Sequence, residues 1–293
     1  MVGATVDLQW LIACDLDQTL IYSRRAFRLP EGEPEPEVVI AEYLDGQPLS
    51  HLTRLAADGL RELAERVPIV PVTTRTLVQY QRVDLGFAPA YAIAANGGHL
   101  LVDGQADPGW AEQVRGRLAA AGRPLAEVHA LALAIAEKAA EDGSDWVRTV
   151  READGFFVYL VATDRAAIPD LTQLEAELAH AGWGVSVQGR KVYLVPRALT
   201  KEAALAEVMR RTGAVRLVAA GDSLLDLGML SMADVAIRPS HGELHEQGIH
   251  RPLGDASRAP LLVTARPGVL AGQEVVDLLR RVTTTEVTFV TQG

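Results

Sequence analysis

Three short apolar segments, each ending in polar residues, constrain the fold of this chain more than any other feature. They are residues 8–14, 67–72 and 215–220. Apolar runs of this length are typical of strands buried on both faces of a parallel sheet. Helical patterns over residues 52–66 and 201–211 precede the second and third of them. Alternating strands and helices predict an α/β fold, in which ligands bind at the carboxyl ends of the strands.

The region between the second and third segments has a different pattern. Asn-Gly at 96–97 and Asp-Gly at 154–155 separate pairs of apolar stretches, which is typical of β-hairpins. The expected strands are residues 91–95, 99–102, 146–151, 156–162, 184–188 and 192–195. Helical patterns cover residues 109–142 and 169–181. Hairpins combined with helices predict an α+β unit that is built on an antiparallel sheet.

The two patterns together predict two domains. A Rossmann-like parallel-sheet core is expected from residues 1–80 plus 196–293, and residues 81–195 are expected to form an inserted α+β domain. Within the core, residues 38–43 and 47–52 flank an Asp-Gly turn and predict a further hairpin.

Composition and charge exclude several functional classes. The chain has 48% hydrophobic and 23% charged residues, the balance of an ordinary globular protein. Its net charge is −10, so we expect neither nucleic-acid nor membrane binding, because an acidic surface repels phosphate backbones and anionic lipid. The single cysteine, Cys14, cannot form an internal disulfide, which fits a cytoplasmic protein. The expected partner is a small molecule, and the sequence gives no indication of oligomeric state.

Four carboxylates stand at the ends of the predicted strands. Asp15 and Asp17 lie one residue apart directly after the first apolar segment, and Asp222 and Asp226 follow the third. Carboxylates this close repel one another unless a cation lies between them, and Mg²⁺ prefers such oxygen ligands. The pattern therefore predicts a Mg²⁺ site.

A hydroxyl and an ammonium group complete this set. Thr73 follows the second apolar segment, and Lys201 begins the helix before the third. Taken singly, each of these residues has an ordinary structural explanation, such as a helix cap or a solvated side chain. Together, a carboxylate, a metal ion, a hydroxyl and an ammonium group suit phosphoryl transfer.

The order of these groups resembles the motifs of the haloacid dehalogenase (HAD) superfamily, and the resemblance extends over essentially the whole chain. The first motif of that family, DxDGT, is similar to residues 15–19, and the fourth, GDxxxD, is similar to residues 221–226. Thr73 and Lys201 stand where the family has its second and third motifs. The insertion resembles the type-2 cap of the Cof-type, sucrose-phosphatase, mannosyl-phosphoglycerate-phosphatase and phosphomannomutase members.

The resemblance implies a role for each motif residue. Asp15 would be the nucleophile that forms an aspartyl-phosphate, and Asp17 the general acid and base. The expected ligands of Mg²⁺ are the Asp15 carboxylate, the Asp17 backbone carbonyl and Asp222, with Asp226 in support. The residues expected to bind the transferring phosphoryl oxygens are Thr73 and Lys201.

Further residues are expected to bind the substrate. Thr73-Thr74-Arg75 is similar to the TGR of these family branches, and Asn96 begins a hairpin NG that they share. The cap hairpins carry cations that could contact an anionic substrate, and we favour Lys191 and Arg148 over Arg151 and Arg190. Specificity is expected to lie in the cap.

Two positions depart from the family pattern. Gln18 replaces the Gly of DxDGT, so the turn has to accommodate a side chain, and Leu225 stands where Cof-type members commonly have Asn. That Asn is not the main metal ligand. We therefore expect altered metal binding rather than inactivity.

A group of histidines follows the fourth motif. Pro and Gly residues interrupt the segment that contains His241, His245 and His250, so no single helix can align them as metal ligands. We interpret this segment as a solvated loop.

These features predict a Mg²⁺-dependent phosphatase, that is, a phosphoric monoester hydrolase, acting on a small phosphorylated metabolite, and we favour a sugar phosphate. A phosphosugar mutase, which uses the same nucleophile but returns the phosphate to the sugar, is an alternative. A second alternative is a catalytically quiet sensor or partner-binding protein with the same fold, for which Gln18 and Leu225 would argue.

Overall fold

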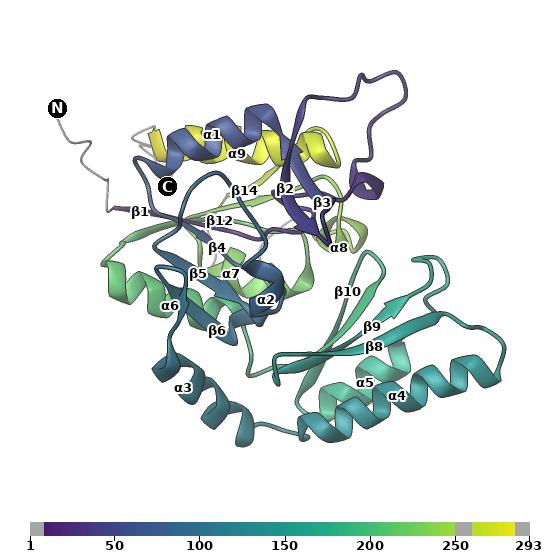
Figure 1. Ribbon diagram of the computed structural model, residues 1–293. Helices are drawn as coiled ribbons and strands as arrows, with labels where there is room; N and C mark the ends of the chain where they lie inside the picture. Colours follow the sequence, from purple (N-terminus) through teal and green to yellow (C-terminus); the bar gives the residue numbers. More distant parts are fainter. Residues whose placement is uncertain (1–8, 250–259, 285–293) are drawn as a thin grey trace, which may run out of the picture.

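The centre of the molecule is a sheet of five parallel strands in the order β14-β13-β12-β1-β4 (Figure 1). The computed structural model describes residues 9–249 and 260–284. The strands are β1 (Trp10–Cys14), β4 (Ile69–Pro71), β12 (Arg216–Ala220), β13 (Val235–Arg238) and β14 (Leu261–Val263). The three predicted apolar segments correspond to β1, β4 and β12, although Leu8 and both ends of the predicted core lie outside the described residues. The predicted α/β fold is confirmed.

The register of the central strands brings their carboxyl ends together. The last residue of β1 pairs with the last residues of both β12 and β4, and all three strands run in the same direction. Asp15, Thr73 and Asp222, which follow these strands directly or within two residues, therefore lie at one edge of the sheet.

Helices cover both faces of this sheet (Figure 1). One face carries α1 (Arg54–Ala64) and α9 (Val269–Thr284), and the other carries α6 (Lys201–Thr212) and α7 (Leu227–Met232). The Thr200 side chain accepts a hydrogen bond from the backbone N–H of Ala203, so α6 begins at Lys201. Among the helices in the described part of the chain, none is long and apolar enough to cross a membrane.

A small antiparallel sheet extends the core next to β4. Its strands are β5 (Tyr91–Ala94), β6 (His99–Val102) and β7 (Gln105–Ala106). Val72 and Ile93 form a parallel bridge, so β5 lies beside the chain that leaves β4. The domain boundary predicted between residues 80 and 81 therefore needs correction, because residues 91–106 pack with the core. A hairpin signal predicts which strands pair with each other, but not which sheet they join.

The inserted unit is a four-stranded antiparallel sheet in the order β10-β11-β9-β8, covered on one face by two helices. Its elements are α4 (Leu125–Glu141), β8 (Val147–Ala153), β9 (Phe157–Ala162), α5 (Thr172–His180), β10 (Trp183–Gln188) and β11 (Lys191–Pro196). We call residues 125–196 the cap. Its sheet lies between its own helices and the core (Figure 1).

The helical pattern predicted over residues 109–142 forms two helices. The first is α3 (Pro108–Ala119), which contacts β6 of the core, and the second is α4 of the cap. Gly122 between them has a φ of 79°, and Pro124 is the N-cap residue of α4. Neither a left-handed glycine nor a proline continues a helix, so the chain changes direction between core and cap at this point.

The hairpin predicted after the first strand is present as β2 (Val38–Leu44) and β3 (Gln47–Thr53). Asp45 and Gly46 at its turn have φ values of 50° and 74°, the conformation that a two-residue hairpin turn requires. β3 runs directly into α1, so the helix predicted from residue 52 begins two residues later. The remaining short helical turns are η1 (Arg24–Ala26), α2 (Leu77–Tyr80), η2 (Ala95–Gly97), η3 (Leu224–Asp226) and α8 (Glu243–Glu246).

Candidate active site

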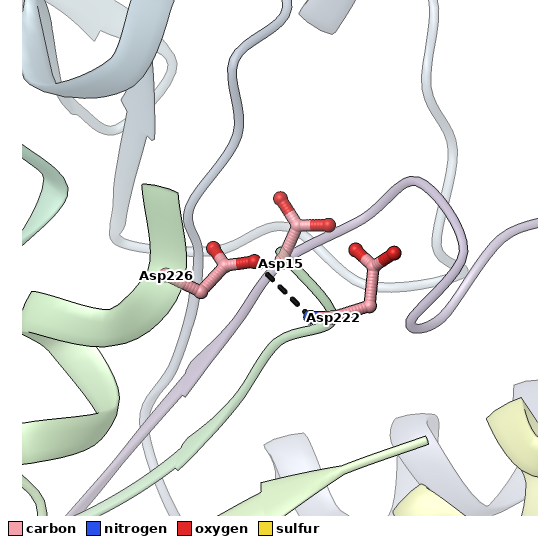
Figure 2. A group of neighbouring side chains, drawn as sticks. All are labelled: Asp15, Asp222 and Asp226. Atoms are coloured by element: carbon pink, nitrogen blue, oxygen red, sulfur yellow. Dashed lines mark hydrogen bonds between the residues drawn. The ribbon is translucent and has the colours of Figure 1, made fainter. Parts of the chain in front are cut away.

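Three buried carboxylates meet at the edge where β1 and β12 end (Figure 2). They belong to Asp15, Asp222 and Asp226, and one oxygen of each lies within 4.8 Å of one oxygen of the others. The backbone N–H of Asp15 donates to the carbonyl of Ala220 at 2.9 Å, so the pairing of the two strands continues into the site. The structure thus brings together the carboxylates that the strand ends predicted.

Lys201 joins two of these carboxylates. Its Nζ donates to Oδ1 of Asp15 and to Oδ1 of Asp226, both at 2.6 Å, and the side chain is fully buried. Burial alone would lower the pKa of Lys201, but the charges of Asp15 and Asp226 outweigh burial and raise it. Lys201 is therefore a fixed positive charge next to Asp15.

Asp226 orders the loop that carries Asp222. Its Oδ2 accepts hydrogen bonds from the backbone N–H groups of Asp222 and Ser223 and from the Ser223 hydroxyl, at 2.8–3.1 Å. A Cβ atom at Gly221 would lie 2.5 Å from the Asp226 side chain, which explains the glycine at that position. Because Lys201 occupies the other oxygen, Asp226 is placed to hold the loop rather than to bind a metal ion directly.

The charge at the site fits a divalent cation. Burial raises the pKa of Asp15 to about 7, against the influence of Lys201, and burial together with Asp15 and Asp226 raises the pKa of Asp222 well above its usual range. When all three carboxylates are ionised, Lys201 balances one and leaves two negative charges without a counter-charge. Oxygen ligands with two excess negative charges suit Mg²⁺, and Asp15 and Asp222 are the residues that could hold it.

Asp17 is held by Arg75. Nε and Nη2 of Arg75 donate to the two carboxylate oxygens of Asp17 at 2.7 and 2.8 Å, a bidentate ion pair. Burial opposes ionisation of Asp17, but Arg75 outweighs it and lowers the pKa of Asp17 to about 2. Asp17 is therefore oriented as an anion, ready to accept a proton.

Arg75 was predicted to bind substrate, and its guanidinium already has several partners within the chain. Its Nη1 donates to the buried carboxylate of Glu42 at 2.7 Å, and its Nη2 also reaches the Ser50 hydroxyl at 3.3 Å. All three guanidinium nitrogens are thus occupied within the chain. The sequence analysis missed Glu42 and Ser50, whose only signal was a polar pair on opposite strands of the β2–β3 hairpin.

The other predicted phosphate-binding residues are close by. Thr73 is fully buried, and its Oγ1 accepts a hydrogen bond from the backbone N–H of Arg75 at 3.1 Å, so its own hydrogen can still be donated. The Thr74 hydroxyl donates to the hydroxyl of Tyr193 in the cap at 3.4 Å. Phosphate binding by Thr73 and substrate binding by Thr74 stay predictions.

The side chain of Asn96 makes a hydrogen bond within the chain. Its side-chain amide is buried and donates to the carbonyl of Leu199 at 2.9 Å, two residues before Lys201. The contact fixes the chain that leads into α6. Substrate binding by Asn96 stays a prediction, and the geometry supports a role in placing Lys201.

Comparison with known proteins gives a fold and no closer relationship. No family model and no curated protein matches the sequence. A sucrose-phosphatase from Synechocystis sp., solved with sucrose and phosphate, is similar over 93% of this chain and 98% of its own, with 14% identity and a TM-score of 0.58. A trehalose-6-phosphate phosphatase related protein covers the same shares with 17% identity and a TM-score of 0.50. A haloacid dehalogenase-like hydrolase from B. subtilis has 16% identity, coverage of 92% and 98%, and a TM-score of 0.50.

This chain has the HAD fold. The similarity covers both the parallel-sheet core and the cap, as the sequence resemblance implied. Asp15 directly follows β1 in this fold, and the contacts around its side chain determine which chemistry is possible.

Gln18 departs from the HAD motif, and the structure shows what accommodates it. Its φ is 64°, a conformation in which glycine is favoured. Tyr22 and His241 donate to its backbone carbonyl at 2.8 and 2.9 Å and so hold the turn. Its side-chain Nε2 lies 3.5 Å from Oδ2 of Asp222, and its Oε1 accepts a hydrogen bond from Arg28. The residue that replaces glycine therefore lies against a candidate metal ligand.

The prediction of a solvated histidine loop is wrong for His241. This side chain is buried, and its Nδ1 accepts a hydrogen bond from the backbone N–H of Gly268 at 3.1 Å. Nε2 must then carry the hydrogen that is donated to Gln18, so the ring is neutral. Burial lowers the pKa of His241 to about 4. His250 lies outside the described residues.

Glu243 connects the core of the HAD fold to the cap. Its Oε2 accepts hydrogen bonds from the Ser186 hydroxyl of β10 at 2.7 Å and from the backbone N–H of Leu224 at 2.9 Å. Its Oε1 accepts one from the backbone N–H of Val187 at 2.7 Å. Figure 1 shows the end of β10 beside α8, which carries this residue. No sequence motif pointed to Glu243.

The predicted cap cations differ in their surroundings. Lys191 lies 5.6 and 5.9 Å from the ring centres of Tyr159 and Tyr193. Tyr193 and Asp17 raise the pKa of Lys191, against the effect of burial. Lys191 is therefore a cation that interacts with Asp17 of the candidate active site. Arg148 lines a cavity together with Lys191. Arg190 instead is half-buried and donates to the carbonyl of Thr163.

Proposed function

We propose that this protein is a Mg²⁺-dependent phosphatase that hydrolyses a small phosphorylated metabolite through an aspartyl-phosphate on Asp15. The observation that carries the proposal is the environment of that carboxylate. Asp15 lies at the end of a central strand, with the ammonium of Lys201 at 2.6 Å on one oxygen and the carboxylate of Asp222 close by. A buried carboxylate of this kind becomes a nucleophile when cations offset the charge of the incoming phosphate.

In the first step, the Asp15 carboxylate forms a bond to phosphorus while the bond to the leaving oxygen breaks. Lys201 is placed to offset the charge of the phosphoryl oxygens, and the Thr73 hydroxyl is placed to donate to one of them. Mg²⁺ bound by Asp15 and Asp222 would supply further charge neutralisation. Asp17 would give the leaving oxygen a proton that it takes up as the substrate binds, because the negative charge of the phosphate raises the pKa of Asp17.

In the second step, water hydrolyses the aspartyl-phosphate and restores Asp15. Asp17 accepts a proton from the attacking water, and inorganic phosphate leaves. The bidentate contact with Arg75 keeps Asp17 in the anionic form that this step needs. One residue thus acts in both steps, and Arg75 fixes its position.

A sugar phosphate is the substrate that we favour. The rings of Tyr159 and Tyr193, 5.5 Å apart, lie on the cap face that looks toward the core. Such rings offer an apolar surface and a hydroxyl, which match the C–H and hydroxyl groups of a sugar. The similar sucrose-phosphatase was solved with a sugar bound. We also propose a cytoplasmic location, because the single cysteine needs no oxidising compartment.

The test is a screen for released phosphate across sugar phosphates, nucleotides and phosphoglycerates, with Mg²⁺ and with excess chelator. We expect turnover only with Mg²⁺ and only when Asp15 is intact. Asp15→Asn is the matched control, because this substitution keeps the shape of the side chain. Transfer of phosphate between sugar positions without release would favour the phosphosugar mutase. Failure of every substrate would favour the sensor.

A further inference from the structure

One cavity on the cap has a charge opposite to that of the chain as a whole. It has a volume of about 300 Å³, and its lining includes Arg148, Arg151 and Lys191. Among the described residues, no Asp or Glu lines it. In a chain with a net charge of −10, three cations around one small cavity are unusual.

The strand register explains why these side chains gather there. Arg151 of β8 pairs with Tyr159 of β9, which in turn pairs with Tyr193 of β11, and Lys191 precedes Tyr193 by two residues. Paired residues, and residues two apart on a strand, share one face of the sheet. This is the face turned away from α4 and α5, toward the core.

Two observations place the cavity near the candidate active site. Gln79 of α2, in the core, forms part of its lining, so both domains contribute to it. Tyr193 beside Lys191 contacts the Thr74 hydroxyl next to Thr73. A substrate with its phosphate at Asp15 can therefore extend into this cavity.

The cations of the cavity form no ion pair with the described residues. In residues 9–249 and 260–284, neither Arg148, Arg151 nor Lys191 has a carboxylate partner within 4.0 Å. Glu152, the neighbour of Arg151, points to the other face and lies 3.7 Å from His129. Cations in a concave site without a carboxylate partner can bind an anionic ligand without first breaking an ion pair.

We propose that the leaving group of the substrate carries a second anionic group, a carboxylate or a phosphate, and that Arg151 and Lys191 bind it in this cavity. This inference rests on the proposed phosphatase activity and specifies its substrate class. The planar guanidinium of Arg151 suits a bidentate contact with either anion. Lys191 adds a second charge close to the catalytic edge.

The test compares kcat/KM for four probes: p-nitrophenyl phosphate, glucose 6-phosphate, 6-phosphogluconate and glucose 1,6-bisphosphate. For the wild type we expect a preference of at least tenfold for one of the last two over glucose 6-phosphate. The preferred one identifies the second anion as a carboxylate or a phosphate. In Arg151→Gln and in Lys191→Gln this preference should fall by at least tenfold, mainly through KM.

Arg190→Gln is the matched control. It removes a neighbouring cap cation that contacts Thr163 instead of the cavity, so the preference should persist. A wild type without the preference, or an Arg151→Gln variant that keeps it, would overturn the inference about the second anion. Turnover of p-nitrophenyl phosphate in the same assays would leave the phosphatase proposal intact. If no probe, p-nitrophenyl phosphate included, released phosphate, both proposals would be wrong.

Discussion

Arg75→Lys tests whether the guanidinium positions Asp17. In the wild type, Arg75 makes two contacts with Asp17, one with Glu42 and one with Ser50. Lysine keeps the positive charge but has a single nitrogen, so it cannot bridge both carboxylates with bidentate geometry. The substitution therefore removes the orientation of Asp17 and leaves the net charge unchanged.

The expected loss of stability follows from these contacts. A hydrogen bond to a charged group contributes roughly 1.5–3 kcal/mol when it is buried. Arg75 is buried and Glu42 is fully buried, but the Asp17 side chain is 37% exposed, so we take the lower part of that range for the lost contact. The free energy of unfolding should fall by about 2 kcal/mol, which corresponds to a decrease in Tm of roughly 3 °C for a chain of this length. The kcat should fall by roughly tenfold or more, because the proton acceptor is misplaced.

Thermal unfolding and steady-state kinetics on the same preparations measure both effects. Arg82→Lys is the matched control, because Arg82 binds the same Glu42 at 2.9 Å but is 29% exposed and lies outside the Asp17 contact. We expect it to change the free energy of unfolding by less than about 1 kcal/mol and to leave kcat unchanged. Equal effects of the two substitutions on kcat would refute the positioning role of Arg75.

Four further predictions test other parts of the site. Asp15→Asn should stay folded by circular dichroism and lose several orders of magnitude in phosphate release, and normal activity would exclude this residue as the nucleophile. Mg²⁺ should raise the Tm of the wild type, and Asp222→Asn should abolish that increase; an unchanged increase would place the metal elsewhere. Glu243→Gln should speed amide hydrogen exchange at Val187, because an NH2 group, which cannot accept a hydrogen bond, replaces one of the two carboxylate oxygens. Unchanged exchange at Val187 would mean that this contact does not hold the cap. Burial lowers the pKa of His241 to about 4, so as the pH falls this histidine is protonated in the unfolded chain before it is protonated in the folded one. The free energy of unfolding should therefore decrease by roughly 3 kcal/mol between pH 6.5 and 4. Urea titrations of His241→Gln should show a weaker dependence, and an equally steep one would contradict the assignment.

Much of this fold could be predicted from local sequence patterns. Apolar runs that end in Asp15, Thr73 and Asp222 mark strands whose ends must meet in a parallel sheet. Turn sequences at the hairpins and the start of α6 at Lys201 depend on neighbouring residues alone. These features can be predicted because the residues that determine each strand, turn or helix start lie within a few positions of it.

The features that the sequence did not reveal depend on distant partners. Arg75 and Glu42 are 33 residues apart, and the pairing arises only when the β2–β3 hairpin folds over the strand ends. His241 is buried because it supports Gln18, which is 223 residues away. The hairpin at Asn96 could be predicted, but its attachment to the core depends on the parallel bridge beside β4. Periodicity carries no information about such long-range contacts.

The three hydrogen bonds of Glu243 have a thermodynamic consequence. One carboxylate holds both β10 of the cap and Leu224, which belongs to the loop that presents Asp222. A ligand that favours one position of the cap therefore also favours one geometry of that loop. By linkage, any free energy by which cation binding at Asp222 stabilises the docked cap equals the free energy by which docking strengthens cation binding. Substrate and metal should consequently change each other's affinity by the same factor, even though neither needs to touch Glu243.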